Sequence, residues 1–193
     1  MSAADPQQSA PGRVVVALRG VSKRFGPVAA VDGIDLELRA GEIHALLGEN
    51  GAGKTTLMCL LDGLYSPDSG RLELDGRPVR FKSPRDAMRA SIGMVHQHFM
   101  LVPTLDVAEN VLLGAERIPL FLRPRRLRAR VQAAADRLGL GVDAAARVGE
   151  LSVGEQQRVE LLRVLDRGAR VLILDEPTAV LSPGEVDALF AAL

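Results

Sequence analysis

The chain has 193 residues, which is enough for one domain with a sizeable core. Lysine plus arginine and aspartate plus glutamate balance at 24 each. This balance argues against a nucleic-acid-binding protein, because such proteins usually carry a net basic charge. No apolar run reaches the roughly 18 residues that a membrane-spanning helix needs. The single cysteine, Cys59, excludes an internal disulfide, and its apolar neighbours predict that it fills the core.

The first part of the chain is predicted to hold three strands and a helix. Residues 1–12 lack the basic start and the apolar stretch of a signal peptide, so we expect a disordered lead-in. Strands are expected over residues 14–18, 34–38 and 42–47, and the third is apolar enough to be buried on both faces. That strand runs directly into a glycine-rich turn and a helix over residues 53–63.

The middle of the chain is predicted to be mostly helical. Strands over residues 71–74 and 78–81 flank Asp75-Gly76, which is a hairpin signal. Ser83-Pro84 then starts a short helix. Residues from about 106 to 147 are expected to be helical. One apolar face of this region is formed by Leu127, Val131, Ala134, Ala135 and Leu138.

The last part contains a buried strand over residues 171–174 and a helix that starts at Ser182. Strands and helices therefore alternate along the chain. This order predicts an α/β fold on a mostly parallel sheet, with a helical insert in the middle.

A phosphate-binding loop is predicted between the third strand and the first helix. Residues 48–55 have the spacing Gly-x4-Gly-Lys-Thr. The glycines let the backbone N–H groups wrap a triphosphate, and the helix start adds partial positive charge. Lys54 is expected to neutralise the β- and γ-phosphates, and the Thr55 hydroxyl to ligate Mg²⁺. The nucleotide-binding set predicted here is Gly48, Asn50, Gly51, Ala52, Gly53, Lys54, Thr55 and Thr56.

Two carboxylates, Asp175 and Glu176, follow the buried strand over residues 171–174. An acid at the end of a parallel strand can hold Mg²⁺ beside a phosphate loop, so Asp175 is the expected metal ligand. Glu176 can accept the proton of the water that attacks the γ-phosphate, so it is the expected general base. The alternative is a solvated acidic strand end.

A second anion site is predicted at Ser152, where a helix begins. Ser152 and Glu155 form a capping box, and Gly154 lies beside them. The stretch Leu151-Ser-Val-Gly-Glu-Gln resembles the signature of ATP-binding cassette proteins, whose usual form is Leu-Ser-Gly-Gly-Gln. In that family two cassettes pack head to tail, and the signature of one covers the ATP held by the other. The resemblance implies that Ser152 and Gly154 contact nucleotide bound by a partner cassette.

The resemblance covers nearly the whole chain from about Val14. The domain that it implies is expected over residues 13–193. It implies a P-loop NTPase core of ABC type, with a mostly parallel central sheet, an antiparallel β subdomain and a helical insert over about residues 98–150. Phe25 stands where the family places an aromatic residue against adenine. Gln97 stands where a family glutamine links Mg²⁺ and the attacking water to the insert. A metal site of His96 and His98 is a weaker alternative, because no third ligand is near in sequence.

Four stretches are most similar to the first cassette of nucleoside and simple-sugar importer ATPases. They are residues 92–103, 109–111, 151–160 and 175–181. The resemblance implies binding of ATP and Mg²⁺, ATP hydrolysis, and a peripheral position on the cytoplasmic face of the membrane. The implied partners are a second cassette, transmembrane permease subunits and, indirectly, an extracellular solute-binding protein. No nucleic acid is expected.

The sequence also departs from the family pattern. Val153 and Glu155 replace a glycine and a glutamine of the signature, and residues 179–182 lack the usual acid. The family's γ-phosphate histidine would lie beyond Leu193, so we expect a cassette truncated at its C-terminus. Two alternatives stay open at this point: a soluble non-transport cassette protein, and a nucleotide-binding fragment without turnover.

Overall fold

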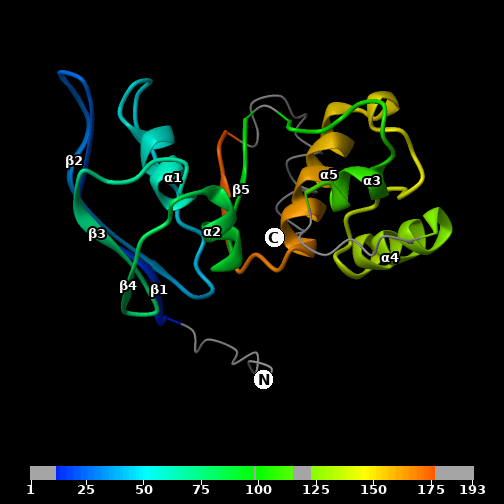
Figure 1. The fold of residues 1–193 in the computed structure, drawn as a ribbon, viewed down its shortest axis with the longest axis horizontal. Coiled ribbons are helices and arrows are strands. Elements are labelled where there is room, and N and C mark those ends of the chain that lie inside the picture. Colours follow the sequence, from blue (N-terminus) through cyan, green and yellow to red (C-terminus); the bar gives the residue numbers. More distant parts are fainter. Residues whose placement is uncertain (1–11, 98, 115–122, 177–193) are drawn as a thin grey trace. The chain divides into compact units, whose positions relative to one another are not determined.

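The computed structural model describes residues 12–97, 99–114 and 123–176, which form two compact units. The first unit covers residues 1–87 and the second residues 88–193. Figure 1 labels the elements of both. The predicted helix at Ser182, the altered stretch 179–182 and His98 lie outside the described residues.

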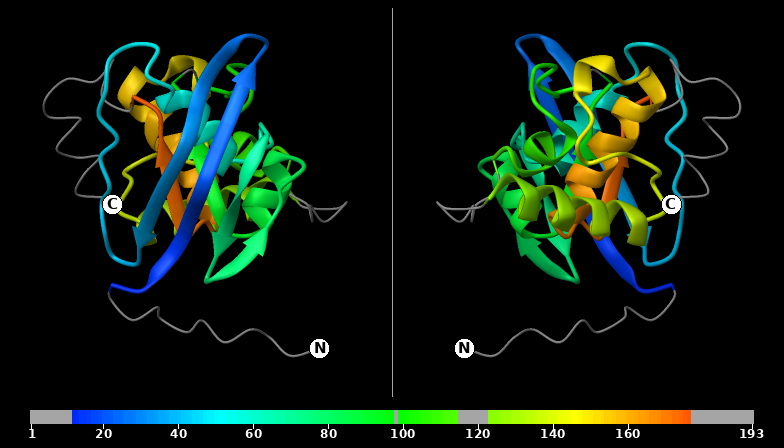
Figure 2. Two further views of the ribbon diagram at one scale, coloured as in Figure 1. Left: turned by 90° about the vertical axis from the view of Figure 1, so that its left-hand side faces the viewer. Right: turned by 90° about the vertical axis from the view of Figure 1, so that its right-hand side faces the viewer.

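The first unit is built on an antiparallel sheet of four strands in the order β2-β1-β3-β4. The strands are β1 (Val14–Phe25), β2 (Val28–Arg39), β3 (Ser69–Leu74) and β4 (Arg77–Val79). Figure 2 shows β1 and β2 as a long pair that runs side by side. Both strands are longer than predicted, because shifts of register let the pairing continue past residues 18 and 34. The predicted hairpin at Asp75-Gly76 is confirmed.

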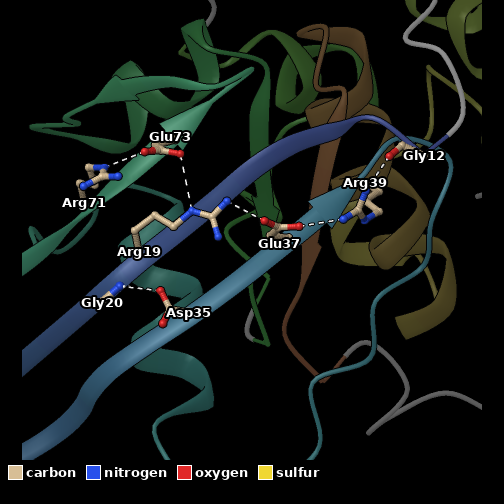
Figure 3. Close-up of polar contacts among 8 residues, drawn as sticks. All are labelled: Gly12, Arg19, Gly20, Asp35, Glu37, Arg39, Arg71 and Glu73. Carbon is tan, nitrogen blue, oxygen red and sulfur yellow. Dashed lines mark hydrogen bonds and ion pairs between the residues drawn. The ribbon is translucent and has the colours of Figure 1, made fainter.

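The exposed side of this sheet carries a chain of ion pairs, which Figure 3 shows. Arg19 contacts Glu37 of β2 at 2.6 Å and Glu73 of β3 at 3.7 Å. The hydrogen bond from Arg19 lowers the pKa of Glu37, and the hydrogen bond from Arg71 lowers the pKa of Glu73. Such exposed pairs contribute little to stability, so we read this face as solvated.

Two helices belong to the same stretch of chain. Helix α1 (Lys54–Leu61) confirms the predicted helix and buries Cys59. Helix α2 (Pro84–Arg89) begins at the predicted proline and ends just beyond the first unit.

The strand predicted over residues 42–47 is wrong. These residues have no strand conformation, and the side chains of Ile43 and Leu47 are 81% and 89% exposed. An apolar run favours burial, but a strand also needs a neighbouring strand to receive its backbone hydrogen bonds. No described strand pairs with this segment.

The second unit combines a parallel strand pair with helices. Strands β5 (Ile92–Val95) and β6 (Val171–Leu174) pair in parallel with Ile92 opposite Val171. The helices are α3 (Val107–Leu112), α4 (Pro124–Arg137), the 3-10 turn η1 (Val148–Glu150) and α5 (Val153–Asp166). The strand β6 forms where it was predicted, but of its four residues only Ile173 is buried and the others are half-buried.

The continuous helical region predicted over residues 106–147 is only partly confirmed. Helix α4 ends at Arg137, because Gly139 and Gly141 follow and disfavour helix. The predicted apolar face is confirmed. Val131, Ala134 and Ala135 are buried in the core of this unit, and Leu127 and Leu138 pack against it.

Asn110 anchors the start of α3 from inside this core. Its side chain is fully buried; it accepts a hydrogen bond from the Val102 N–H at 2.7 Å and donates to the carbonyls of Val102 and Asp106 at 3.0 Å. Each such bond contributes about 1 kcal/mol net. Asn110 therefore fixes the chain between β5 and α3.

Candidate functional site

The predicted phosphate loop lies in the first unit, ahead of α1. Gly53 is the N-cap of α1 with φ 87°, and a Cβ atom there would overlap the Ala30 carbonyl oxygen of β2. Only glycine fits both the backbone angle and this close approach. The loop is therefore held tightly against β2 immediately before the helix begins.

The start of α1 offers free backbone donors. Among the described residues, no side chain caps this helix and no acid occupies its first turn. The first N–H groups of a helix need an external acceptor, and an anion supplies one. The Lys54 ammonium donates to the carbonyls of Gly48 at 2.8 Å and Glu49 at 2.9 Å, which keeps it over the loop. Thr55 is exposed and Thr56 half-buried on the first turn of the same helix.

Phe25 ends strand β1 and is 43% exposed. Its ring packs edge-on against Tyr65, with ring centroids 5.2 Å apart and an interplanar angle of 71°. The Lys23 ammonium lies 5.7 Å from the Phe25 centroid. This group leaves an aromatic surface on which a base can stack. Tyr65 was not predicted; its signal in the sequence was that it is the only tyrosine.

The acidic pair and Gln97 lie together in the second unit, at the carboxyl ends of β5 and β6. The Asp175 N–H donates to the Val95 carbonyl at 3.1 Å, which extends the parallel pairing to the acid. The Gln97 amide donates to the Glu176 carboxylate at 3.2 Å. The amide nitrogen of Gln97 is thus used, and its oxygen remains as an acceptor or metal ligand. The sequence placed these two residues near each other only through the resemblance.

Glu176 adopts an unusual backbone conformation. Its φ of 48° lies in the left-handed region that a glutamate rarely occupies. Strain of this kind tends to be kept at functional sites, where it aims a side chain. Asp175, one residue earlier, is buried at 7% exposure, whereas Glu176 is exposed.

The predicted capping box at the start of α5 is confirmed. The Glu155 N–H donates to Ser152 Oγ at 3.3 Å, and the Ser152 N–H donates to the Glu155 carboxylate at 2.8 Å. Ser152 is exposed and Gly154 is buried. Val153, which stands in place of the usual glycine, is 44% exposed.

Three of the predicted site residues carry oxygen atoms of the kind that Mg²⁺ binds, and Mg²⁺ prefers few protein ligands together with the phosphates of its substrate. They are the Thr55 hydroxyl in the first unit, and the Asp175 carboxylate and Gln97 amide oxygen in the second. Within the described residues, no cluster of three or more His, Cys, Asp or Glu side chains could hold a metal ion. The His96–His98 alternative stays untested, because His98 lies outside those residues.

Comparison with known proteins identifies the family. The family model described as ABC transporter matches residues 31–179. The chain belongs to this family. Of the helices in the described ranges, none combines the length and apolarity needed to cross a bilayer.

The curated relatives of the cassette are import proteins. It is 53% identical over 184 residues to the ribose import ATP-binding protein RbsA 1 of Burkholderia thailandensis, covering 93% of this chain and 36% of that protein. It is 51% identical over 177 residues to the guanosine import ATP-binding protein NupO of Bacillus subtilis, covering 91% and 34%. The cassette thus spans about a third of the length of these relatives.

Solved structures confirm the fold class. The cassette superposes on cbiO1 of Clostridium perfringens, described as part of an ABC transporter complex, with a TM-score of 0.77 and 32% identity over 93% of this chain and 72% of that one. The TM-score is 0.75, at 25% identity over 92% and 80%, for the dimeric cassette MJ0796 in a post-hydrolysis state bound to ADP and Pi. The cassette therefore has the α/β P-loop fold of ABC ATPases.

Replacing Lys54 should weaken nucleotide binding strongly. Its ammonium sits over the loop, and charge-assisted hydrogen bonds are worth about 1.5–3 kcal/mol each. We expect Lys54→Ala to weaken binding of a fluorescent ATP analogue about 100-fold, measured by titration. Lys82→Ala, an exposed lysine outside the loop, is the matched control. Unchanged affinity in Lys54→Ala would remove the phosphate-loop assignment.

Proposed function

We propose that this chain is an ATP-binding and ATP-hydrolysing cassette of an ABC importer that takes up a simple sugar or a nucleoside. The contact between Gln97 and Glu176 supports the proposed ATP hydrolysis, because it orients the Glu176 carboxylate, which lies just after the end of β6. The identity of about 50% to ribose and guanosine import proteins supports the transport part. It favours transport over a non-transport cassette.

Each of the predicted site residues has its own role at the nucleotide. Phe25 stacks on the base, with Tyr65 supporting its ring. The N–H groups of residues 48–53 and the Lys54 ammonium bind the β- and γ-phosphates. Ser152 and Gly154 present the start of α5 to a nucleotide held by a second cassette.

Mg²⁺ would be held by Thr55, Asp175 and the Gln97 amide oxygen, and it would neutralise charge that develops on the phosphates. Glu176 takes the proton of the attacking water. The Gln97 amide donates to the Glu176 carboxylate and so fixes which oxygen faces that water. The strained backbone at Glu176 gives the carboxylate its direction.

Transport requires contact with membrane subunits. A groove of about 370 Å³ lies between the segment after β5 and the start of α5. It is lined by Gln97, Phe99, Leu101, Pro103, Val153 and Gln156. Its apolar walls beside Gln97 suit a helix of a permease subunit, which would place the chain on the cytoplasmic face of the membrane as a peripheral subunit. An extracellular solute-binding protein acts only through that permease.

Replacing the proposed base should separate binding from hydrolysis. In the protein at its natural length, we expect Glu176→Gln to lower kcat about 100-fold or more, because general-base catalysis contributes about 10²–10⁴. The Kd for ATP should stay within about twofold, because Glu176 contributes little to ground-state binding. Phosphate release and nucleotide titration measure the two. Glu42→Gln, an exposed acid outside the site, is the control. Persistent turnover in Glu176→Gln would exclude Glu176 as the base.

The import role predicts a membrane partner. The natural-length protein, affinity-purified in mild detergent from its own cells, should carry a polytopic membrane protein. Phe99→Ser in the groove should reduce that recovery, because it removes an apolar contact. Val28→Ser, which also replaces an apolar residue with serine but at a site 60% exposed on the sheet, should not. Absence of any membrane protein from the wild-type preparation would contradict import while leaving ATP hydrolysis untouched.

A further inference from the structure

Helix α5 and its C-cap residue, Arg167, carry three charged residues on one face that the proposed chemistry does not use. Glu160, Arg163 and Arg167 are spaced three and four apart, so they line up along the helix. The Arg167 guanidinium donates to the carbonyl of Leu113, the C-cap residue of α3. The other two hold the segment that follows Gln97.

Glu160 and Arg163 both form hydrogen bonds with the backbone of Met100, one with its N–H group and the other with its carbonyl. Glu160 Oε1 accepts a hydrogen bond from the Met100 N–H at 2.7 Å, and Arg163 Nη1 donates to the Met100 carbonyl at 2.9 Å. The two side chains also pair with each other at 2.6 Å. The Met100 side chain itself is 62% exposed, so the backbone and not the side chain is what α5 holds.

Glu160 is only 2% exposed, and this burial raises its pKa despite the nearby Arg163 and the Met100 N–H. A buried ion pair adds little net stability compared with apolar side chains of similar size, because both charges lose their hydration. Such a pair is better explained by the geometry that it fixes. Here it fixes the backbone three residues after Gln97.

The same helix begins at the signature. Ser152 caps α5, and Glu160 lies about 12 Å further along the axis at 1.5 Å per residue. A helix is stiff over two turns, so a displacement of its capped start moves Glu160 as well. Met100 follows Glu160 through the two hydrogen bonds, and Gln97 lies on the same short segment, in contact with Glu176.

We propose that Glu160 is a positioning residue that, with Arg163, ties the Gln97 segment to the signature helix. Contact of nucleotide with Ser152 is thereby transmitted to Gln97 and so to Glu176. This proposal rests on the proposed ATPase function. It assigns Glu160 no contact with nucleotide; the residue acts through the Met100 backbone.

Kinetics of the natural-length protein test the proposal. Glu160→Ala should lower kcat about 10- to 100-fold, because misplacing a catalytic group by about 1 Å has effects of this size. KM for ATP should stay within about twofold. Glu160→Gln should fall in between, since its amide oxygen still accepts the Met100 N–H but leaves Arg163 without its charge partner. Asp166→Ala breaks another ion pair of α5, with Arg130, and should leave kcat within about twofold.

A double variant separates positioning from a general loss of structure. If Glu160 acts through Gln97, then Gln97→Ala with Glu160→Ala should be no slower than Gln97→Ala alone, because residues that act as a unit are not additive. Losses that multiply would overturn the proposal. So would a kcat of Glu160→Ala equal to that of Asp166→Ala. If Glu160→Ala does not fold, Glu160→Gln takes its place in the same cycle.

Hydrogen exchange gives a readout that needs no turnover. The Met100 amide should exchange at least about tenfold faster in Glu160→Ala, and at its wild-type rate in Asp166→Ala, because only the first removes its acceptor. Unchanged protection of Met100 would overturn the proposal by itself. A wild-type protein that binds but never hydrolyses ATP would instead refute the proposed function, and exchange at Met100 would still decide whether the tie exists.

Discussion

Helix α5 approaches strand β5 so closely that a Cβ atom at Gly93 would overlap the Val164 side chain. This contact sets the second unit, because α5 buries Val159, Leu161 and Leu162 completely in the core that also holds α3 and α4. Without a side chain at position 93, the Val164 side chain of the helix packs directly against the backbone of the strand, and the ends of both become fixed relative to each other. Gln97 follows that strand, and Ser152 caps that helix, so one packing contact places two predicted site residues.

The polar groups of the second unit follow from the same arrangement. Gln97 and Glu176 meet because β5 and β6 are parallel neighbours, whose carboxyl ends emerge at one edge. Glu160 is buried because it leaves α5 toward the segment that continues from β5. In the first unit, the start of a helix lies against a strand. There, Gly53 lets α1 begin against β2 with its N–H groups open to an anion. The start of α5 in the second unit is different, because Ser152 caps it and Glu155 lies in its first turn, and its contact with a nucleotide of a partner cassette is a proposal.

Much of this was accessible from the sequence. The phosphate loop, the acidic pair and the capping box at Ser152 are local patterns, and helix α1, strand β6 and helix α5 beside them form where predicted. The strand predicted over residues 42–47 does not form, because an apolar run indicates a preference for burial but not the presence of a neighbouring strand to pair with. The hydrogen bond between Glu160 and Met100 could not be predicted from the sequence either, since the two residues are far apart in sequence and Met100 contributes only its backbone. Tyr65 was missed because its role depends on lying edge-on to Phe25.

We infer that both helix starts serve nucleotide, α1 in its own cassette and α5 in a partner cassette. Hydrogen exchange on the natural-length Glu176→Gln protein, with and without MgATP, tests it most directly. MgATP should slow exchange at residues 48–56 and also at residues 152–156, because the second helix start covers a nucleotide across an interface. Protection confined to residues 48–56 would exclude a nucleotide contact at the start of α5, since the chain would then bind ATP without using its signature.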